Sequence, residues 1–589
     1  NAHHRHRTRR KKRWSQRSLR QATESVTEAE KRSSSILCSI RSDYVCATGA
    51  GVCDTVQDMS TNESASAQSA AAQPAAARAT LASWIQSKRQ NYYDTDTDLQ
   101  AVLSYYLGAD SLAKERPQLS AFGAESATIL DDLIRENNRD EHLPVLRRYD
   151  SIGRRIDEIV FHPSYVEIGR LAYRTGAMSR YAQPGQERIQ LAYCYLLAHH
   201  GEGGHLCPFA CTAGLIKIVQ ARGDEALKAR LLPGLLHTDR TDPQHYHGAQ
   251  FLTELQGGSD VGQNAVIARR DGDAWRISGE KWFCSVIDAD LYLMTARPEG
   301  APSGTAGLGA FVVPRLLADG TPNGVHIRRL KYKLGTRSMA SAEADFHDAL
   351  AWAVGDPASG FKAVVEVVLN TSRVYNAIAA CGMMRRAELE ATSYAAHREA
   401  FGHKIASFPL VKRTLSRITT ERRNAVAGTF GLIALADQIS LGQADDTVRA
   451  VFRLVVNMNK YFTAIRCTDV IRQAIEVLGG NGAIEDFSVL PRLLRDSIVI
   501  EAWEGTHNVL CAQILRDLQK LQLHRAFFSF VKARAKSQSV LDQLARCEQQ
   551  TEALLLSSAE EAALAIRDVV DQLMPLWQRV CVEESLPSA

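Results

Sequence analysis

The sequence of 589 residues lacks several features that would assign it to a class at once. Its twelve cysteines, spread from Cys38 to Cys581, contain no C-x-x-C pair, which excludes a disulfide scaffold or a zinc ribbon and suits a reducing compartment. No run of 18 or more uncharged apolar residues occurs, so no membrane-spanning helix is predicted. No internal repeat is evident, and the composition is that of a globular protein.

Acidic residues are missing from one end of the chain. Residues 1–20 carry nine Lys or Arg and no acid, so the remainder holds 61 basic and 66 acidic side chains, a net charge of −5. This mildly acidic body argues against broad nucleic-acid binding. The basic head is compatible with an organelle-targeting segment, a nuclear or nucleic-acid patch, or an extension beyond the true start. A mitochondrial and a cytoplasmic location therefore both remain open.

The hydrophobic pattern changes character along the chain and predicts an α+β multidomain protein. Apolar residues recur at helical spacing up to about residue 246, β-prone runs joined by Asp271-Gly272 follow, and helical spacing returns after Pro357. The predicted parts are a basic, low-complexity and flexible leader (1–80), an N-terminal helical domain (81–246), a middle β domain (247–355), a C-terminal helical bundle (356–521) and a helical appendage (522–589).

Three segments carry candidate chemistry. In "FLTELQGGSDVG", Gly257 and Gly258 let a ligand approach the backbone, although the segment is not G-x-G-x-x-G and by itself indicates an ordinary loop. In "SGEKWFCS", Trp282 and Phe283 suit either a planar cofactor or the core of the β domain. In "IVIEAWEGTHNVL", Glu504 stands within an apolar run, as part of a solvated loop or as a functional carboxylate.

A fourth segment, "HHGEGGHLC", holds five side chains that can bind metal. Its spacing is neither H-E-x-x-H nor a known zinc pattern, and its glycines indicate a turn. A helix end with polar residues is the preferred interpretation, and no metal is expected.

Six motifs stand out along the chain: "TELQGGSDV", "GEKWFCS", "KLGTRSMASAEADF", "HREAFG", "EVLGGNGAIED" and "WEGT". Their order and approximate spacing are those of the acyl-CoA dehydrogenase flavoproteins, so the chain resembles that family over about residues 140–515. The finer resemblance, through "RRYDSIGRRIDEIVFHPSY" and "GGHLCPFACTAG", is to the alkylation-response (AidB-like) branch. The resemblance implies N-terminal helices, a middle β-barrel-like domain and a C-terminal four-helix bundle, with FAD as the cofactor.

The resemblance also implies a set of site residues. Substrate contacts fall on Ser259, Asn370, Arg373 and Gly505. Ser285 replaces the family's threonine opposite the reactive flavin nitrogen and retains its hydroxyl. The implied flavin contacts are Phe251, Leu252, Thr253, Gly258, Ser259, Phe283, Cys284, Ser285, Arg398, Phe401, Glu476, Gly479, Gly480, Thr506 and Asn508.

Two arginines point to an oligomer. Arg373 and Arg398 lie 25 positions apart on what the pattern predicts to be one helix, a separation of roughly 37 Å. Guanidinium groups so far apart do not serve one end of one cofactor. Arg373 resembles the family's CoA-side arginine, and Arg398 matches a residue that reaches the FAD of a neighbouring subunit. A homodimer or homotetramer is expected.

Glu504 resembles the family's catalytic base. Removal of a proton α to a thioester carbonyl requires a positioned base in a dry site, and the neighbouring indole is expected to raise the pKa of Glu504 from about 4.3. Some family members carry their base one residue before the CoA-side arginine, but that position is Ser372 here.

The expected activity is α,β-dehydrogenation of an acyl-CoA thioester to a trans-2-enoyl-CoA, with electrons passing to an electron-transfer flavoprotein or another acceptor. The alternatives are a flavin-containing stress-protection or binding protein with little turnover, and an acyl-CoA oxidase.

The sequence departs from the family pattern in two places. Phe408-Pro409 stands where relatives carry a glutamine, and residues 525–589 hold seven basic against nine acidic side chains, so nucleic acid is not an expected partner.

Overall fold

The computed structural model describes residues 62–587, and the chain from Ala76 onward forms one compact unit. Helix α2 (Asn62–Ser87) covers an alanine-rich stretch that the sequence assigned to a flexible leader ending at residue 80. The structure departs from that expectation because alanine has the highest intrinsic helix propensity. The basic head, residues 1–20, lies outside the described residues.

The N-terminal domain is built from helices with strong local start signals. Asp96 accepts a hydrogen bond from the Leu99 N–H before α3, and Asp224 accepts one from the Leu227 N–H before α9. The helices are α3 (Thr97–Leu107), α4 (Ala109–Glu125), α5 (Asp131–Asn137), α6 (Pro163–Tyr173), α7 (Glu187–Ala198), α8 (Leu206–Arg222) and α9 (Glu225–Leu235).

A β-hairpin interrupts these helices and was not predicted. β1 (Val145–Tyr149) pairs antiparallel with β2 (Arg155–Val160). The Asp150 carboxylate accepts hydrogen bonds from the N–H groups of Ile152 and Arg154 at 3.0 and 2.9 Å, and Gly153 adopts a left-handed φ of 79°. This Asx turn was visible in "DSIGR". Both strands are partly or fully exposed, so the alternation that marks a half-buried strand is weak.

The middle domain is a closed barrel, as predicted. Pairings run β6–β4–β5–β9–β7 and return to β6, while β3 adds to β6 and β8 adds to β9. The Asp271–Ala274 pair closes the β4–β5 hairpin, with Gly272 at φ 62°. The strands are β3 (Gly248–Phe251), β4 (Ile267–Asp271), β5 (Ala274–Ser285), β6 (Leu291–Pro298), β7 (Gly309–Pro314), β8 (Val325–Leu330) and β9 (Ser341–Ala353).

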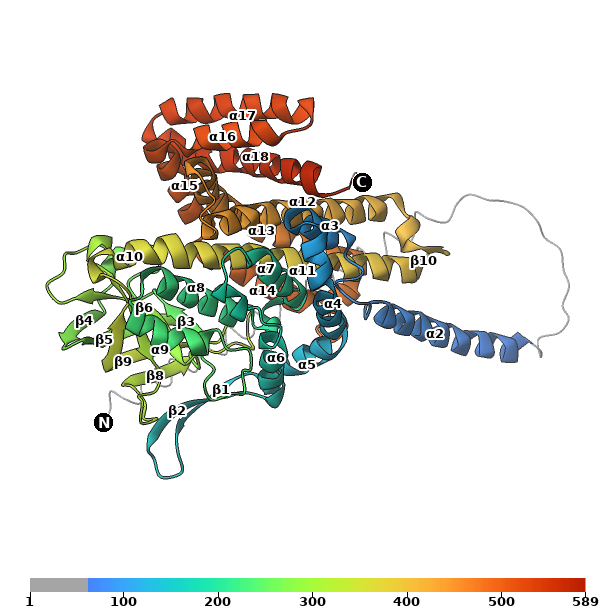
Figure 1. The fold of residues 1–589 in the computed structure, drawn as a ribbon. Helices are drawn as coiled ribbons and strands as arrows, with labels where there is room; N and C mark the ends of the chain where they lie inside the picture. The colour runs from blue at the N-terminus through green and yellow to red at the C-terminus, as the bar shows by residue number, and fades with distance from the viewer. Residues whose placement is uncertain (1–61, 588–589) are drawn as a thin grey trace, which may run out of the picture. The chain divides into compact units, whose positions relative to one another are not determined.

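The C-terminal domain is a bundle in which α11 packs against α12 and α13, and α13 against α14 (Figure 1). A π-helical segment, Val364–Leu369, leads directly into α11. A short β10–β11 ribbon (Glu399–Ala400, His403–Lys404) follows α11, and helices α16–α18 form the predicted appendage. The helices are α10 (Gly360–Ala363), α11 (Asn370–His397), α12 (Pro409–Ser440), α13 (Asp446–Leu478), α14 (Leu490–Ala502), α15 (His507–Leu521), α16 (Leu523–Arg534), α17 (Gln538–Leu556) and α18 (Ala559–Ser585).

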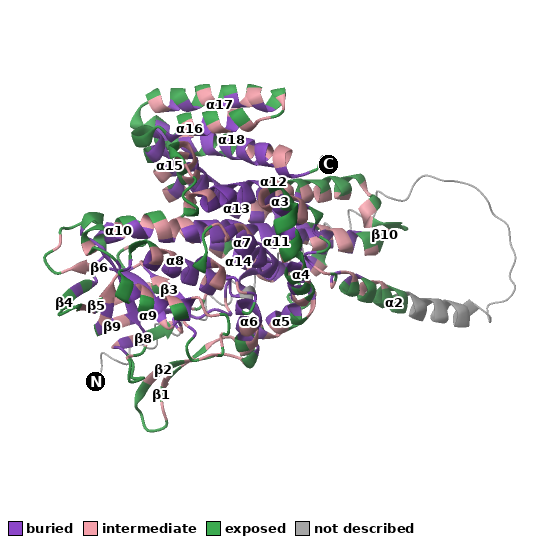
Figure 2. Ribbon diagram, viewed as in Figure 1, coloured by how far each residue is buried: buried purple, intermediate pink, exposed green. Residues whose placement is uncertain are grey.

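Buried apolar side chains form two clusters. Figure 2 shows buried residues both in the helical domains and in the barrel. One is continuous through the N-terminal and C-terminal helices, and the other fills the barrel. Trp503, directly after α14, packs against both clusters. The segment that follows Trp503 is therefore held where the helical and β cores meet.

None of the helices in the described part of the chain is long and apolar enough to cross a membrane. The nine cysteines described there are free thiols.

Close packing of α11 on α7 generates a test of the fold. A Cβ added to Gly382 would lie 2.4 Å from the Ala198 Cβ and 2.5 Å from the Tyr195 carbonyl oxygen. We expect Gly382→Val to lower the free energy of unfolding by about 1–3 kcal/mol through overpacking, measured by thermal unfolding. Ala396→Val, at an exposed position of the same helix, is the control. An equal decrease in the free energy of unfolding in both variants would contradict this packing.

Candidate active site

Glu504 lies in the short turn between α14 and α15, in a conformation that few residues adopt. Its φ is 57° and that of Gly505 is 106°. A non-glycine residue in the left-handed region costs about 1–3 kcal/mol and persists only where the surroundings enforce it. The apolar run of "IVIEAWEGTHNVL" is interrupted at Trp-Glu-Gly-Thr because the chain reverses its direction there through two left-handed residues.

Two buried cations from different helices hold this turn by its carbonyl oxygens. The Arg373 Nε, on α11, donates to the Glu504 carbonyl at 3.2 Å. The Lys460 Nζ, on α13, donates to the carbonyls of Glu501 and Gly505 at 2.8 and 2.9 Å. Both side chains are buried, Arg373 at 4% and Lys460 at 0% relative exposure. The turn therefore depends on side chains 131 and 44 positions earlier in the sequence.

Arg373 is itself fixed by polar neighbours. Its Nη1 donates to the Asn457 Oδ1 at 2.6 Å and to the Asn370 Oδ1 at 3.4 Å, and its Nη2 donates to the Gln513 Oε1 at 3.2 Å. The predicted substrate residues Asn370, Arg373 and Gly505 are thus brought together around Glu504.

The electrostatics of Glu504 are those of a partly dehydrated acid. Burial raises the pKa of Glu504, and the nearby charges of Arg373 and Lys460 oppose that rise. Within the described chain, the Glu504 carboxylate has no hydrogen-bond donor or ion-pair partner, since Arg373 and Lys460 bind backbone oxygens instead. The carboxylate is therefore free to accept a proton from a bound molecule.

The barrel brings two predicted flavin segments together. The Trp282 N–H donates to the Thr253 carbonyl at 2.9 Å, which joins the "TELQGGS" loop to the end of β5. Beneath them, the Lys281 Nζ binds Glu254 at 2.7 Å, and both side chains are buried. Ser285 lies 3.0 Å from the Ser341 Oγ.

The predicted flavin residues on the strands differ in whether their side chains point to the surface or into the barrel core. Phe283 is 50% exposed, whereas Phe251 and Cys284 are fully buried in the barrel core. Phe251 packs against Tyr292, with the ring centroids 4.7 Å apart. Phe251 and Cys284 can therefore contact a cofactor only through their backbone atoms.

The remaining predicted flavin residues fall into two groups at opposite ends of α11. Arg398 is the C-cap of that helix, and Phe401 in the following ribbon is 94% exposed. The Asn481 Nδ2, next to Gly479 and Gly480, donates to the Tyr394 hydroxyl at 3.0 Å. Glu476, Gly479 and Gly480 are therefore near Arg398, whereas Thr506 and Asn508 begin the helix next to Glu504.

The "HHGEGGHLC" side chains are directed to separate partners. His199 lies 3.0 Å from the Tyr195 carbonyl, His200 3.0 Å from the Ser126 carbonyl and His205 3.1 Å from the Tyr165 carbonyl. Burial raises the pKa of Glu202 to about 8. These groups do not converge on one point.

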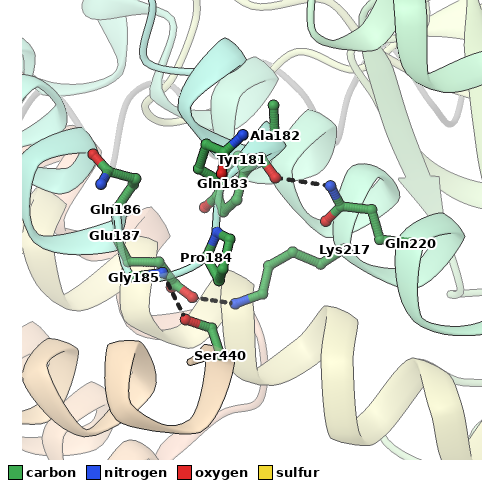
Figure 3. A pocket seen from close by; sticks show the side chains of 10 residues that line it. All are labelled: Tyr181, Ala182, Gln183, Pro184, Gly185, Gln186, Glu187, Lys217, Gln220 and Ser440. Atoms are coloured by element: carbon green, nitrogen blue, oxygen red, sulfur yellow. Dashed lines mark hydrogen bonds and ion pairs between the residues drawn. The ribbon is translucent and has the colours of Figure 1, made fainter. Parts of the chain in front are cut away.

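A cavity of about 360 Å³ lies apart from Glu504, between the segment before α7, α8 and the end of α12 (Figure 3). Its polar groups satisfy one another. Lys217 binds Glu187 at 2.8 Å, Gln220 donates to the Tyr181 carbonyl at 2.8 Å, and the Gly185 N–H donates to the Ser440 hydroxyl at 3.0 Å. None of the predicted site residues lines it, so we place the chemistry at Glu504.

Sequence reasoning missed the residues that support Glu504. Lys460, Asn457 and Gln513 bind the turn or Arg373. Lys460 and Asn457 interrupt the apolar pattern of α13, and a lysine buried in a helical core is uncommon. That interruption was the only signal available.

Comparisons with known proteins identify the family. Family models match residues 85–242 (adaptive response protein AidB, N-terminal domain), 249–349 (acyl-CoA dehydrogenase, middle domain) and 358–519 (acyl-CoA dehydrogenase, C-terminal domain). AidB of Escherichia coli K12 is 34% identical over 394 residues, 64% of this chain and 69% of that protein. The chain belongs to the acyl-CoA dehydrogenase family. It is a FAD-dependent oxidoreductase of acyl-CoA thioesters.

Two further relatives are similar to this chain over most of its length. Acyl-CoA dehydrogenase family member 11 of Caenorhabditis elegans is 29% identical over 473 residues, covering 78% of this chain and 76% of that protein. The crystal structure of C. elegans ACDH-11 in complex with C11-CoA has a TM-score of 0.79 at 25% identity, covering 92% and 91% of the two chains. The apo form of Bd2924 also gives 0.79, at 30% identity, covering 84% and 98%.

The residues present fit FAD. Phe283 offers a half-exposed ring beside the Ser285 hydroxyl, which suits a flat ring system. No side chain caps α15 at Thr506, so the free N–H groups of its first turn suit a phosphate. A Cβ placed on Gly480 would meet no atom within 4 Å, so that backbone is open to close approach.

The buried Lys281–Glu254 pair generates a test of the flavin loops. We expect Lys281→Met to destabilise the protein by about 3–5 kcal/mol, because it leaves the Glu254 carboxylate buried and unpaired, and to lower the FAD content after purification. Thermal unfolding and flavin absorbance measure the two effects.

Arg269→Met is the control, since the Arg269–Asp348 pair of the same domain is more than half exposed overall and such pairs contribute little. Full FAD content in Lys281→Met would show that the pair does not support the cofactor loops.

Proposed function

We propose that this protein catalyses α,β-dehydrogenation of an acyl-CoA to a trans-2-enoyl-CoA with Glu504 as the base. The observation that carries the proposal is the Glu504 carboxylate itself. Partial burial raises its pKa, it is unpaired within the described chain, and it is held in a strained turn whose carbonyls are bound by Arg373 and Lys460.

Each residue then has a defined role. Glu504 takes the proton from the α carbon of the thioester, and its raised pKa brings it closer to the pKa that proton transfer at neutral pH requires. FAD, when bound, accepts the hydride that leaves the β carbon. Trp503 packs on both hydrophobic clusters and limits the access of water to the carboxylate.

The alternative position for a base does not carry a carboxylate. Ser372 lies one residue before Arg373, and its hydroxyl donates to the Gln250 Oε1 at 3.3 Å. A serine hydroxyl without an adjacent base does not remove a weakly acidic proton. We therefore assign the base to Glu504 and not to Ser372.

Glu504→Gln tests the proposal. We expect the rate of flavin reduction by C11-CoA without oxygen to fall by about 10²–10⁴, because glutamine cannot accept the α proton, while FAD content stays unchanged. In the wild type the rate should rise with pH through a value above the ordinary glutamate pKa of about 4.3, since only the carboxylate form acts as the base. Stopped-flow absorbance measures both.

The same assay distinguishes the rival functions. A flavin spectrum that no acyl-CoA changes would indicate a binding protein, and rapid peroxide formation in air would indicate an oxidase. Reoxidation by an electron-transfer flavoprotein, but not by oxygen, supports the dehydrogenase.

We also propose that the enzyme is a homo-oligomer whose active sites combine residues of two subunits. α11 spans 28 residues, or about 42 Å. It separates Arg373 from Arg398 and its neighbours Phe401, Gly479 and Gly480. Since one set lies beside the base and the other at the far end, the second set serves the FAD of a partner. The exposure of Phe401 supports the same conclusion.

Complementation tests the shared site. We expect Arg398→Ala and Glu504→Gln to be inactive as homo-oligomers, whereas a hybrid made by co-expression regains one intact site from Glu504 of one chain and Arg398 of the other. Tandem-tag purification followed by the flavin-reduction assay should give about half of the wild-type activity per hybrid dimer. A hybrid as inactive as its parents, or an active monomer by light scattering, would refute the assignment.

A further inference from the structure

We propose that Lys460 is the positioning residue of the catalytic base: its ammonium group binds the carbonyls on both sides of Glu504 and places a positive charge close to the Glu504 carboxylate. The inference rests on the function proposed above for Glu504. It concerns what makes the base effective, whereas the previous experiments concern whether Glu504 is the base.

The geometry places Lys460 under the turn. Its Nζ donates to the last turn of α14 through Glu501 and to the glycine after the base through Gly505. These two carbonyl groups belong to residues on either side of Glu504 in the sequence. Because one ammonium group binds both of them, it restrains both ends of the turn. Because Glu504 and Gly505 are both left-handed, the reversal is strained and requires such anchors.

Lys460 differs from the other buried lysines of the fold in its partners. Lys88 meets Glu390 at 2.9 Å, and Lys281 meets Glu254 at 2.7 Å. Lys460 has only backbone carbonyls within hydrogen-bond distance in the described chain, although Glu504 is the anion with the largest effect on it. A buried ammonium without a direct carboxylate partner is costly, which indicates that its charge acts on a group nearby.

The charges that act on Lys460 come from α11, α14 and the turn that follows α14. Arg373 on α11 lowers its pKa, and Glu501 on α14 is engaged by His507 of α15 at 2.9 Å. Glu504 is thus the facing anion that no side chain neutralises directly. Burial lowers the pKa of Lys460 to about 7, and the Glu504 charge opposes that fall.

Three substitutions separate the hydrogen bonds from the charge. Lys460→Gln retains N–H donors for the carbonyls but not the charge, Lys460→Met removes both, and Lys460→Arg retains the charge. Lys88→Met is the matched control, since it removes a buried lysine from an ion pair that contacts no residue of the site.

The main readout is the pH profile of flavin reduction by C11-CoA. In Lys460→Gln and Lys460→Met we expect the acid limb to move upward by at least about one pH unit, because an opposite charge close to a carboxylate shifts its pKa by about 1–3 units. The plateau rate should fall at least tenfold further in Lys460→Met than in Lys460→Gln. Lys460→Arg should keep the limb in place.

A second readout does not involve turnover. The pKa of Lys460 lies below its ordinary value of about 10.4, so the unfolded state binds the extra proton between pH 7 and 10 and stability rises with pH in that window. The thermal midpoint of the wild type relative to Lys460→Met should therefore increase from pH 7 to 9.5. Lys460→Gln supplies the same comparison if Lys460→Met does not fold.

The outcomes distinguish this inference from the proposed function. If Glu504→Gln abolishes flavin reduction but the acid limb is the same in Lys460→Gln and the wild type, only the role of Lys460 is overturned. A limb that moves equally in Lys88→Met also overturns it, because that shift would reflect general destabilisation. If Glu504→Gln reduces its flavin normally, the proposed function fails first.

Discussion

The candidate site depends on two buried cations that bind backbone oxygens rather than carboxylates. Arg373 and Lys460 hold the carbonyls of the turn between α14 and α15, and this arrangement leaves the Glu504 side chain unpaired. If either cation bound the Glu504 carboxylate directly, the pKa of Glu504 would fall further, and the carboxylate would be a poorer base. Binding the turn by its main chain fixes the position of the acid, and the two charges then only oppose the rise in the Glu504 pKa that burial causes.

Helix α11 determines how the rest of the chain is arranged about that turn. At its start a π-helical segment leads into Asn370 and Arg373, and at its end Arg398 caps the helix before the exposed ribbon. π-Helical segments are rare and concentrate at functional sites. Because the helix is buried along most of its length, it fixes the distance between the two predicted sets of flavin residues. That distance is the basis of the homo-oligomer proposed above.

Much of the fold was predictable because local signals agreed with tertiary packing. Asp271-Gly272 closes a hairpin and Pro357 begins a short helical turn, as their intrinsic preferences require. The β1–β2 hairpin was missed because its strands are largely exposed and lack clear alternation. Residues 62–80 are helical despite their low-complexity composition, because alanine has a high intrinsic helix propensity.

Only those site residues that lie in segments resembling the family could be predicted from the sequence. Glu504, Arg373 and Ser285 lie in segments whose residue types and order resemble a family, whereas Lys460 lies in the middle of a 33-residue helix. Its role arises from a contact across 44 positions that no local pattern records. The orientation of side chains was also beyond the sequence. The motif that supplies Phe283 to the surface directs the adjacent Cys284 into the barrel core, so a motif match cannot distinguish a side-chain contact from a backbone contact.

The basicity of Glu504 is therefore a property of two domains together. Trp503 is covered on one side by the helical cluster and on the other by the barrel, and burial is the main cause of the raised Glu504 pKa. A small displacement of the barrel from the bundle would admit water beside the indole, and the pKa would return toward its ordinary value. The Lys281–Glu254 pair lies within the barrel, yet it supports the loop that faces the bundle. Under the proposed function, the basicity of Glu504 thus depends on both domains, including the barrel that holds the Lys281–Glu254 pair, although this pair does not contact Glu504.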